Sequence, residues 1–340
     1  MCCVYLMVYV KASGNLYNGM NSGKVCVIIV NWNGWQDTIS CLKSILLSKT
    51  QPERIIVCDN GSSDRSPELI LSWVAEHKEF VLDKHKEGDL SLENRNSILF
   101  TLLRNDSNLG YAAGNNKGIQ FALSENKFQF IWLLNNDASV QFNSLGELLR
   151  CSRESSAGIF GSTIVYDDRK EFVQCAGGCS YNPLTTCFRP ILAGKPLKDV
   201  IHASSPLEMD YIYGASFFVR SNVFKQCGLL NESFFLFYEE IDFCRRAMSV
   251  GYKLFWCKKS VVVHKGSKSI GRPGISDRNK IAYANYHENF STLLFTKIHH
   301  KKLLPCVLLI RFFGKLMMIV LRGEWFLVSP LVKAYRDFLY

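Results

Sequence analysis

The sequence predicts an α/β fold in which a mostly parallel sheet is flanked by helices. Short apolar segments rich in β-branched residues recur through the first half of the chain, and helical patterns lie between them. Nearly continuous apolar segments of this kind are typical of strands covered on both faces, and strand–helix alternation favours parallel pairing. The expected strands are Val25–Val30, Ile55–Cys58, Ile98–Leu103 and Phe130–Leu134.

Three helices are expected between these strands. Trp35–Leu47 carries apolar residues at helical spacing. Ser66 and Pro67 form a helix start, with serine as the cap and proline in the first position, and Leu69–His77 continues this helix. The third helix is expected over Asn115–Ser124.

Beyond residue 150 the alternation weakens, and residues 160–210 are expected to form strands and loops. A strand is predicted over Tyr211–Arg220, a helix over Glu239–Val250 and a further strand over Val261–Val263. The expected organisation is a loose leader, an α/β domain of two halves, and a basic amphipathic helical tail. Their ranges are 1–24, 25–270 (halves 25–150 and 151–270) and 271–340.

Positive charge is concentrated near the C-terminus. The 340 residues include 40 Lys and Arg against 30 Asp and Glu, for a net charge of +10. From Lys258 to Tyr340 there are 15 basic and 4 acidic residues, so the preceding part of the chain is nearly neutral. This distribution excludes evenly spread nucleic-acid-binding charge but allows a local basic surface.

An apolar stretch, Leu303–Leu321, lies within the basic tail, and Arg311, Lys315 and Arg322 are spaced to share one helical face. Such a helix can lie in a membrane interface with its cations toward anionic headgroups, or pack on its own domain. The upstream cluster Lys297–Lys302 favours the membrane.

The cysteines indicate reduced thiols in a cytosolic protein. There are 13, without a C-x-x-C pair, and the spacing of Cys175, Cys179 and Cys187 fits no zinc template. The apolar start, Met1–Val10, lacks the basic residues and the cleavage site of a signal peptide.

Polar residues follow three of the predicted strands: Asn31, Asp59 and Asp137. Ligands of parallel sheets bind beyond the carboxyl ends of the strands, so this position is the first functional signal. Asp59 can accept hydrogen bonds from a base or a ribose, or form an Asx-turn. Asp137, in the segment Asn135–Asp137, can bind a divalent cation or simply belong to a turn.

Two further segments carry candidate chemistry. Asn108–Gly118 is a small-residue loop opening a helix, where backbone N–H groups can hold a diphosphate or form a capped turn. Three acids, Glu239, Glu240 and Asp242, gather at a predicted helix start, where the helix dipole favours them. Asp242 is spaced to pair with a following arginine, whereas Glu240 is free to act as a general base for an alcohol. His264 ends a strand and is suited to a metal, a phosphate or a structural role.

Taken in order, these segments resemble the family-2 glycosyltransferases of the GT-A fold, in the branch that includes bacterial polysaccharide rhamnosyltransferases. The resemblance runs from about Val25 to about Ser269. The matching segments are Asn31–Gly34, Asp59–Asp64, Asn108–Gly118, Asn135–Asp137 at the DXD position, Asp210–Ala215, Glu239–Arg245 and His264–Gly266.

The resemblance implies roles for individual residues. Asp137 and His264 would hold Mg²⁺ or Mn²⁺, and Glu240, or its neighbour Glu239, would be the base. The donor site would comprise Asn31, Asn33, Asp59, Gly114, Asn115, Asn116 and Asn135, and the acceptor side Gly214 and Asp242. Asn135 replaces an Asp found in many relatives, and Glu240 also replaces an Asp.

The implied function is inverting sugar transfer from a nucleotide-sugar to a hydroxyl of a glycan or lipid-linked acceptor in surface polysaccharide synthesis. The expected location is the inner face of the cell membrane, with an anionic membrane surface, not nucleic acid, as partner. A sugar-phosphate nucleotidyltransferase is disfavoured because Asn31–Gly34 lacks a Gly-rich basic signature. A non-catalytic scaffold is disfavoured because acids are present at both Asp137 and Glu240.

Overall fold

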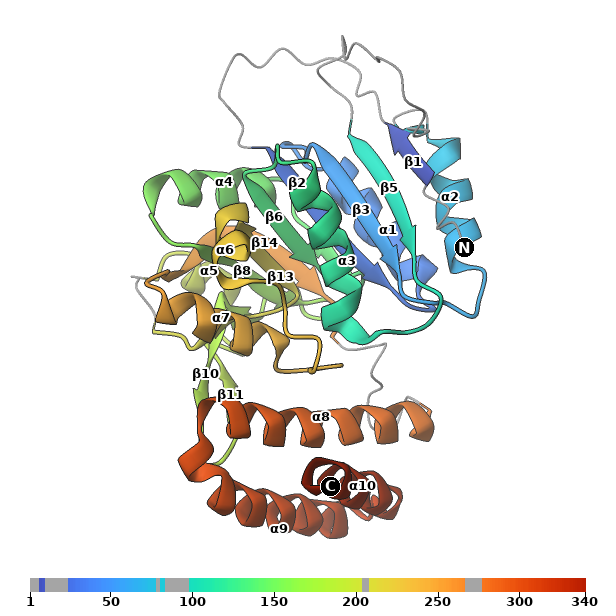
Figure 1. The fold of residues 1–340 in the computed structure, drawn as a ribbon. Coiled ribbons are helices and arrows are strands. Elements are labelled where there is room, and N and C mark those ends of the chain that lie inside the picture. The colour runs from blue at the N-terminus through green and yellow to red at the C-terminus, as the bar shows by residue number, and fades with distance from the viewer. Residues whose placement is uncertain (1–5, 10–23, 78–79, 83–97, 204–207, 267–276) are drawn as a thin grey trace.

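A mixed sheet runs through the computed structural model, which describes residues 6–9, 24–77, 80–82, 98–203, 208–266 and 277–340 (Figure 1). In this part of the chain the sheet has eleven strands, in the order β1-β4-β5-β3-β2-β6-β13-β8-β14-β7, with β9 beside β8. The strands are β1 (Leu6–Tyr9), β2 (Val25–Asn31), β3 (Arg54–Asp59), β4 (Val81–Leu82), β5 (Leu99–Arg104), β6 (Phe130–Leu134), β7 (Ala138–Val140), β8 (Ile159–Tyr166), β9 (Val173–Ala176), β13 (Ser216–Arg220) and β14 (Leu254–His264).

The first half of the sheet is parallel, as the apolar strands predicted. Strands β5, β3, β2 and β6 run side by side in one direction, with Asn31 opposite Asp59 and Asp59 opposite Arg104. Helix α3 (Gly110–Ser124) covers one face, and α1 (Trp35–Leu46) and α2 (Ser66–Glu76) lie behind the other (Figure 1). The carboxyl ends of three strands therefore place their polar residues at one edge.

The second half is mixed, because β13 pairs antiparallel with both β6 and β8 while β14 pairs parallel with β8. The last residue of β14, His264, lies opposite Ala138 at the start of β7. This pairing brings His264 beside Asp137. Around this half lie a small sheet of β10 (Gly178–Asn182), β11 (Cys187–Pro190) and β12 (Tyr211–Ile212), and the helices α4 (Ser144–Glu154), α5 (Leu197–Val200), α6 (Ser221–Cys227) and α7 (Glu239–Ser249).

Three sequence-based expectations about these elements are corrected. Helix α3 begins at Gly110, five residues before the expected start. The strand expected over Tyr211–Arg220 is broken between β12 and β13, which belong to different sheets. Within the leader expected to be loose, Leu6–Tyr9 forms β1, which pairs with β4 and β5 at the edge of the sheet. Most of the remaining leader lies outside the described residues, as does the expected boundary at 270/271.

The C-terminal helices form a layer of their own below the sheet domain (Figure 1). Helix α8 (Arg278–His299) lies nearest the domain, and η1 (Lys301–Leu303), α9 (Leu304–Arg322), η2 (Trp325–Leu327) and α10 (Val328–Leu339) follow. Their own apolar core includes Leu293, Val307, Ile319, Leu327 and Leu331. Two hydroxyls of α8 bond to the loop before α7: Ser291 Oγ donates to the Leu236 carbonyl (2.9 Å) and Thr292 Oγ1 to the Tyr238 hydroxyl (2.9 Å).

Candidate active site

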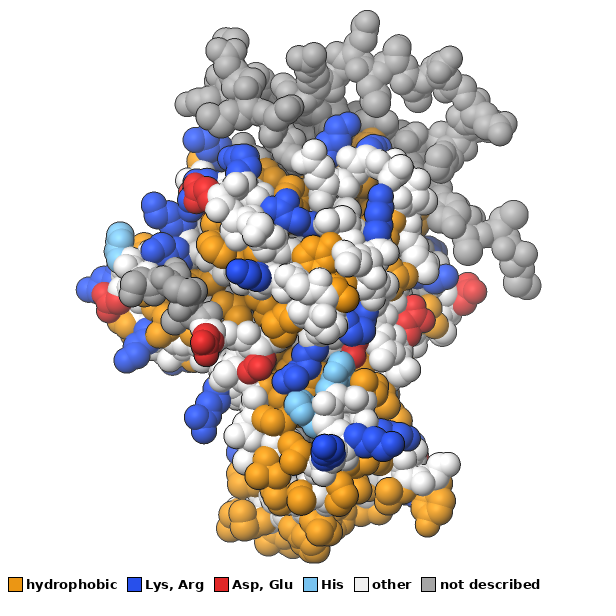
Figure 2. Space-filling model, turned by 60° about the vertical axis from the view of Figure 1, so that its left-hand side comes forward, with side chains coloured by type: hydrophobic (Ala, Val, Ile, Leu, Met, Phe, Trp, Pro, Cys, Tyr) orange, Lys and Arg blue, Asp and Glu red, His pale blue; other side chains and the backbone are white. Residues whose placement is uncertain are grey.

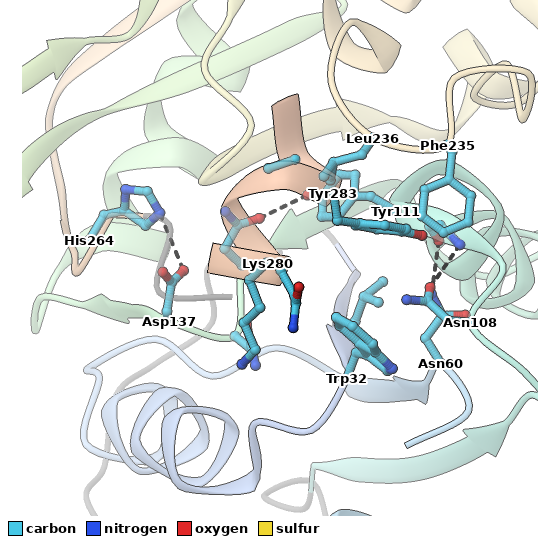
Figure 3. Close-up of a pocket in the computed structure, with 16 residues that line it drawn as sticks. Trp32, Asn60, Asn108, Tyr111, Asp137, Phe235, Leu236, His264, Lys280 and Tyr283 are labelled. Carbon is cyan, nitrogen blue, oxygen red and sulfur yellow. Dashed lines mark hydrogen bonds and ion pairs between the residues drawn. The ribbon is translucent and has the colours of Figure 1, made fainter. Parts of the chain in front are cut away.

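A pocket of about 480 Å³ opens at the carboxyl edge of the parallel strands (Figure 3). Loops after β2, β3, β5 and β6 form its floor, and the start of α8 and the loop before α7 form its roof. The pocket is lined by Val30, Trp32, Asn60, Asn108, Gly110, Tyr111, Asn135, Asn136, Asp137, Phe235, Leu236, His264, Asn279, Lys280, Tyr283 and Ala284. It combines an aromatic end with an end that carries Asp137 and His264.

Asp59 does not line the pocket. Its side chain is buried, with Oδ1 accepting from Asn31 Nδ2 (2.8 Å) and from the Ser62 hydroxyl (2.6 Å), and Oδ2 from the Ser62 backbone N–H (3.1 Å). Asn33 Oδ1 accepts from the Ser63 backbone N–H (2.8 Å). These contacts fix the two loops against each other, so the polar residues expected to contact a nucleotide hold the loops that present Trp32 and Asn60.

Gly114, Asn115 and Asn116 do not line the pocket either. Because α3 starts at Gly110, they fall inside the helix, where backbone N–H groups are used by the helix itself. Asn116 Nδ2 donates to the Leu230 carbonyl (2.9 Å), and Asn115 Nδ2 to the Tyr111 carbonyl (2.9 Å). Asn108, Gly110 and Tyr111 form the pocket wall instead, and a donor-site role of the three residues stays a prediction.

Asp137 and His264 form the polar end of the pocket. His264 Nε2 lies 3.2 Å from Asp137 Oδ1, and both side chains are about 95% buried. Burial opposes the charged carboxylate, but the hydrogen bond and charge of His264 outweigh it and hold the pKa of Asp137 below its ordinary value. The other ring nitrogen of His264, Nδ1, lies 3.0 Å from Gln174 Oε1, which orients the ring.

Asp137 and His264 fit a cation that is shared with a bound diphosphate. Among the described residues no group of three or more His, Cys, Asp or Glu side chains is placed to hold a metal ion. Magnesium, however, is usually held by one or two carboxylates together with substrate phosphates, and imidazole is a suitable ligand for several divalent metals. A carboxylate and an imidazole side by side in this pocket are of the kinds that this pattern requires.

Glu239 and Glu240 begin α7 after two residues in the left-handed region, Phe237 (φ 67°) and Tyr238 (φ 73°). Such conformations are strained for bulky side chains and often mark functional sites. Glu239 is buried, and its Oε2 has no hydrogen-bond partner in the described part of the chain. Burial and the neighbouring Glu240 raise the pKa of Glu239 well above its ordinary value, and burial also raises the pKa of Glu240.

Glu240 lies directly over Gly214, at the break between β12 and β13. A Cβ atom added at Gly214 would overlap Glu240 Oε1, so only glycine leaves room for this carboxylate. The Tyr111 hydroxyl donates to Asn135 Oδ1 (2.9 Å) and approaches the Gly214 carbonyl (3.5 Å). Neither Glu239 nor Glu240 lines the pocket, but Tyr111, which does, connects Asn135 with the Gly214 backbone beneath Glu240.

Asp242 has a structural environment instead. It is buried, and its carboxylate pairs with Arg246 (2.8 Å) on the next turn and with His299 (2.8 Å) at the end of α8. Asp242 does not line the pocket, and its place on the acceptor side stays a prediction. The arginine pairing suggested by the sequence is confirmed.

The sequence analysis did not identify several residues that line the pocket. Trp32 stands between two predicted site residues, Asn31 and Asn33, and its aromatic side chain directly after a strand was a usable signal. Tyr111 likewise lies within a segment already singled out. Lys280 and Tyr283 come from α8, about 140 residues beyond Asp137, and no local pattern connects them with the pocket (Figure 3).

Comparison with known proteins agrees with this architecture. Residues 26–174 match the family model for glycosyl transferase family 2. The low-salt glycan biosynthesis hexosyltransferase Agl10 of Haloferax volcanii is 26% identical over 238 residues, which cover 70% of this chain and 66% of that protein. The chain thus spans just under two thirds of the length of this curated relative.

Solved structures show the same fold at low identity. GalNAc-T7 with UDP, GalNAc and Mn²⁺ has a TM-score of 0.55 at 15% identity, covering 79% of this chain and 50% of that one. The mannosyltransferase PcManGT from Pyrobaculum calidifontis, in complex with GDP-Man and Mn²⁺, has a TM-score of 0.50 at 12% identity, covering 94% and 87%.

A parallel half joined to a mixed half, with a pocket across their strand ends, defines a glycosyltransferase domain of the GT-A fold. Its segment 26–174 is similar in sequence to family 2 of the glycosyltransferases. The predicted fold class is therefore confirmed.

Proposed function

We propose that the chain transfers a sugar from a nucleotide-sugar donor to an acceptor hydroxyl with inversion at the anomeric carbon. The observation that carries this proposal is that Tyr111, in the same pocket as Asp137, approaches the carbonyl of Gly214, over which Glu240 lies. One side of the site is suited to a cation and a diphosphate, and the other to a base. Inverting transfer requires both functions around one reacting carbon.

In this proposal the donor nucleotide lies along the floor of the pocket. Trp32 provides an aromatic face for the base, and Asn60 and Asn108 provide amide groups at the same end (Figure 3). Asp137 and His264 would hold a divalent cation, which would supply positive charge to a departing diphosphate. Lys280 extends into the pocket from α8 and adds a positive charge above the same region.

Glu240 is proposed to remove the proton from the acceptor hydroxyl. As that oxygen bonds to the anomeric carbon, the bond from this carbon to the diphosphate oxygen breaks, and the nucleoside diphosphate leaves with the bonding electrons. Burial and the neighbouring Glu240 raise the pKa of Glu239, which favours the protonated form of Glu239 beside Glu240. The neutral neighbour leaves the negative charge on Glu240, nearest Gly214.

The proposed acceptor is a glycan or a lipid-linked glycan at the cytoplasmic face of the cell membrane, within surface polysaccharide synthesis. Support comes from the apolar C-terminal helices and from the glycan biosynthesis role in the name of the Haloferax volcanii relative. Resemblance to polysaccharide rhamnosyltransferases makes a deoxyhexose donor one of those to test.

The proposal is tested by incubating purified protein with Mn²⁺ and a panel of nucleotide-sugars, including a deoxyhexose donor. We expect release of nucleoside diphosphate from one preferred donor, measured by chromatography. Formation of a nucleotide-sugar from a sugar phosphate and a nucleoside triphosphate would instead support the nucleotidyltransferase. A lack of metal-dependent binding to every donor would support the scaffold.

Gly214→Ala is expected to lower kcat for this release by about 10²-fold, because the new Cβ displaces Glu240, and a misplacement near 1 Å can have that effect. Gly314→Ala on α9 is the matched control, since nothing lies within 4 Å of a Cβ added there. Equal kcat in the two variants would contradict the assigned position of Glu240.

A further inference from the structure

We propose that α9 docks flat on an anionic lipid bilayer through its outer face and does not cross the bilayer. The proposal rests on the membrane partner proposed above and adds the surface that binds it and its orientation. Four apolar side chains repeat at intervals of four residues along α9 and are exposed. They are Leu309 (62% exposed), Phe313 (62%), Met317 (58%) and Leu321 (73%).

This stripe lies within a larger apolar surface. Ile310, Met318 and Val320 extend it along α9, and Trp325 in η2 lies beyond the end of the helix and is 62% exposed. In the space-filling view, hydrophobic side chains cover the lower pole of the molecule (Figure 2). Exposed apolar surface of this extent marks a protein or membrane interaction site, and tryptophan is favoured at the membrane interface.

The inner face of α9 contributes Val307 and Ile319 to the apolar core and also carries two cations that already have partners. Arg311 donates from Nε to Asn289 Oδ1 (3.0 Å) and from Nη2 to Glu288 Oε1 (3.0 Å), and Lys315 Nζ donates to the same glutamate (2.9 Å). The sequence left open whether these cations face lipid headgroups or pack on the protein; the structure places Arg311 and Lys315 toward α8, with only 8% of Arg311 exposed. The negative charge of Glu288 on α8 explains why Arg311 and Lys315 point inward.

The contacts of Arg311 and Lys315 with Glu288, here called the polar seam, determine how α9 is oriented on the membrane. By length and composition alone, Lys301–Arg322 is long and apolar enough to cross a bilayer. Crossing would strip Glu288 from Arg311 and Lys315 and leave two cations near the middle of the hydrocarbon, where charges are strongly disfavoured. Lying flat keeps the seam intact and buries only the stripe.

Charge identifies the partner as an anionic bilayer. Lys301 and Lys302 lie exposed before the first turn of α9, and Arg322 lies exposed at its last, so cations bracket the apolar stripe. An antiparallel pair of two copies would bring these like charges together, which opposes a dimer through this face. Anionic headgroups beside both ends of the helix would neutralise them.

Helix α8 connects this surface with the pocket. Its middle carries Glu288 and Asn289 toward α9, and its first turns carry Lys280 and Tyr283 into the pocket roof. Docking through α9 therefore holds the pocket one helix layer above the lipid. This arrangement suits an acceptor carried by the membrane.

The test compares binding of the full chain to phosphatidylcholine vesicles with and without phosphatidylglycerol, by flotation. The double variant Leu309→Gln, Phe313→Gln is expected to weaken binding to anionic vesicles by at least about tenfold, because two apolar side chains no longer enter the interface. The control is Leu47→Gln, Phe142→Gln, which changes exposed side chains of the same types (76% and 61%) on the sheet domain. We expect this control to bind like the unchanged protein.

Three outcomes would overturn the proposal. Equal binding by both double variants would exclude this face, and retention on vesicles after an alkaline carbonate wash would indicate a spanning helix. Concentration-dependent self-association that is lost in Leu309→Gln, Phe313→Gln would assign the face to a second copy. Metal-dependent nucleoside diphosphate binding, measured in both variants, separates these outcomes from failure of the proposed function, because neither pair lines the pocket.

Discussion

A Glu240→Gln variant is expected to lose about 10²–10⁴-fold in kcat for sugar transfer, while its affinity for the donor nucleotide is unchanged. Glutamine keeps the size of the side chain over Gly214 and removes only its ability to accept a proton. The measurement is single-turnover transfer to an acceptor, with nucleotide binding followed by calorimetry.

Glu239→Gln is the matched comparison. If Glu240 is the base and Glu239 its protonated neighbour, Glu239→Gln retains most of the activity, because glutamine also donates a hydrogen bond. Because burial raises the pKa of Glu240, the active carboxylate is populated only above the ordinary range of glutamate, and activity is expected to fall as pH is lowered through that pKa. Full activity in Glu240→Gln together with loss in Glu239→Gln would assign the base to Glu239.

The strands that position the site were predictable because their signals are local. Val25–Val30 and Phe130–Leu134 are short, apolar and followed by polar residues, and the structure has strands at both places. The start of α3 was not predictable in this way. Its glycines permit close contact with β2, since a Cβ at Gly114 would lie 3.1 Å from Val30 Cγ1, and this contact joins segments far apart in sequence.

In the candidate site, too, local sequence patterns predicted some features and not those that depend on distant contacts. Asp137 and His264 were named from strand ends, and the pairing of β7 with β14 brings them together as expected. The environments of other charged residues depend on α8: Asp242 meets His299 57 residues later, and Glu288 meets Arg311 23 residues later. The sequence showed that these residues are charged but not that His299 would be a partner of Asp242 or that Glu288 would be a partner of Arg311.

Asp137→Asn is expected to weaken Mn²⁺-dependent binding of a nucleoside diphosphate by roughly 10²-fold, because asparagine cannot supply the negative charge that balances the cation. Residues that only support a metal ligand typically change metal affinity by about 10–100-fold, so loss of a ligand is expected to reach the upper end of that range. The measurement is calorimetric titration of nucleoside diphosphate with and without Mn²⁺.

Asp106→Asn is the control for this variant, since Asp106 is an exposed acid that follows β5 at the same edge of the sheet and does not line the pocket. It carries the same change in charge and is expected to leave binding unaltered, so a general electrostatic effect would appear in both variants. Thermal unfolding of Asp137→Asn verifies that loss of the contact with His264 leaves the domain folded. Metal-dependent binding of equal strength in the folded Asp137→Asn variant would mean that the cation, and with it the diphosphate, lies elsewhere.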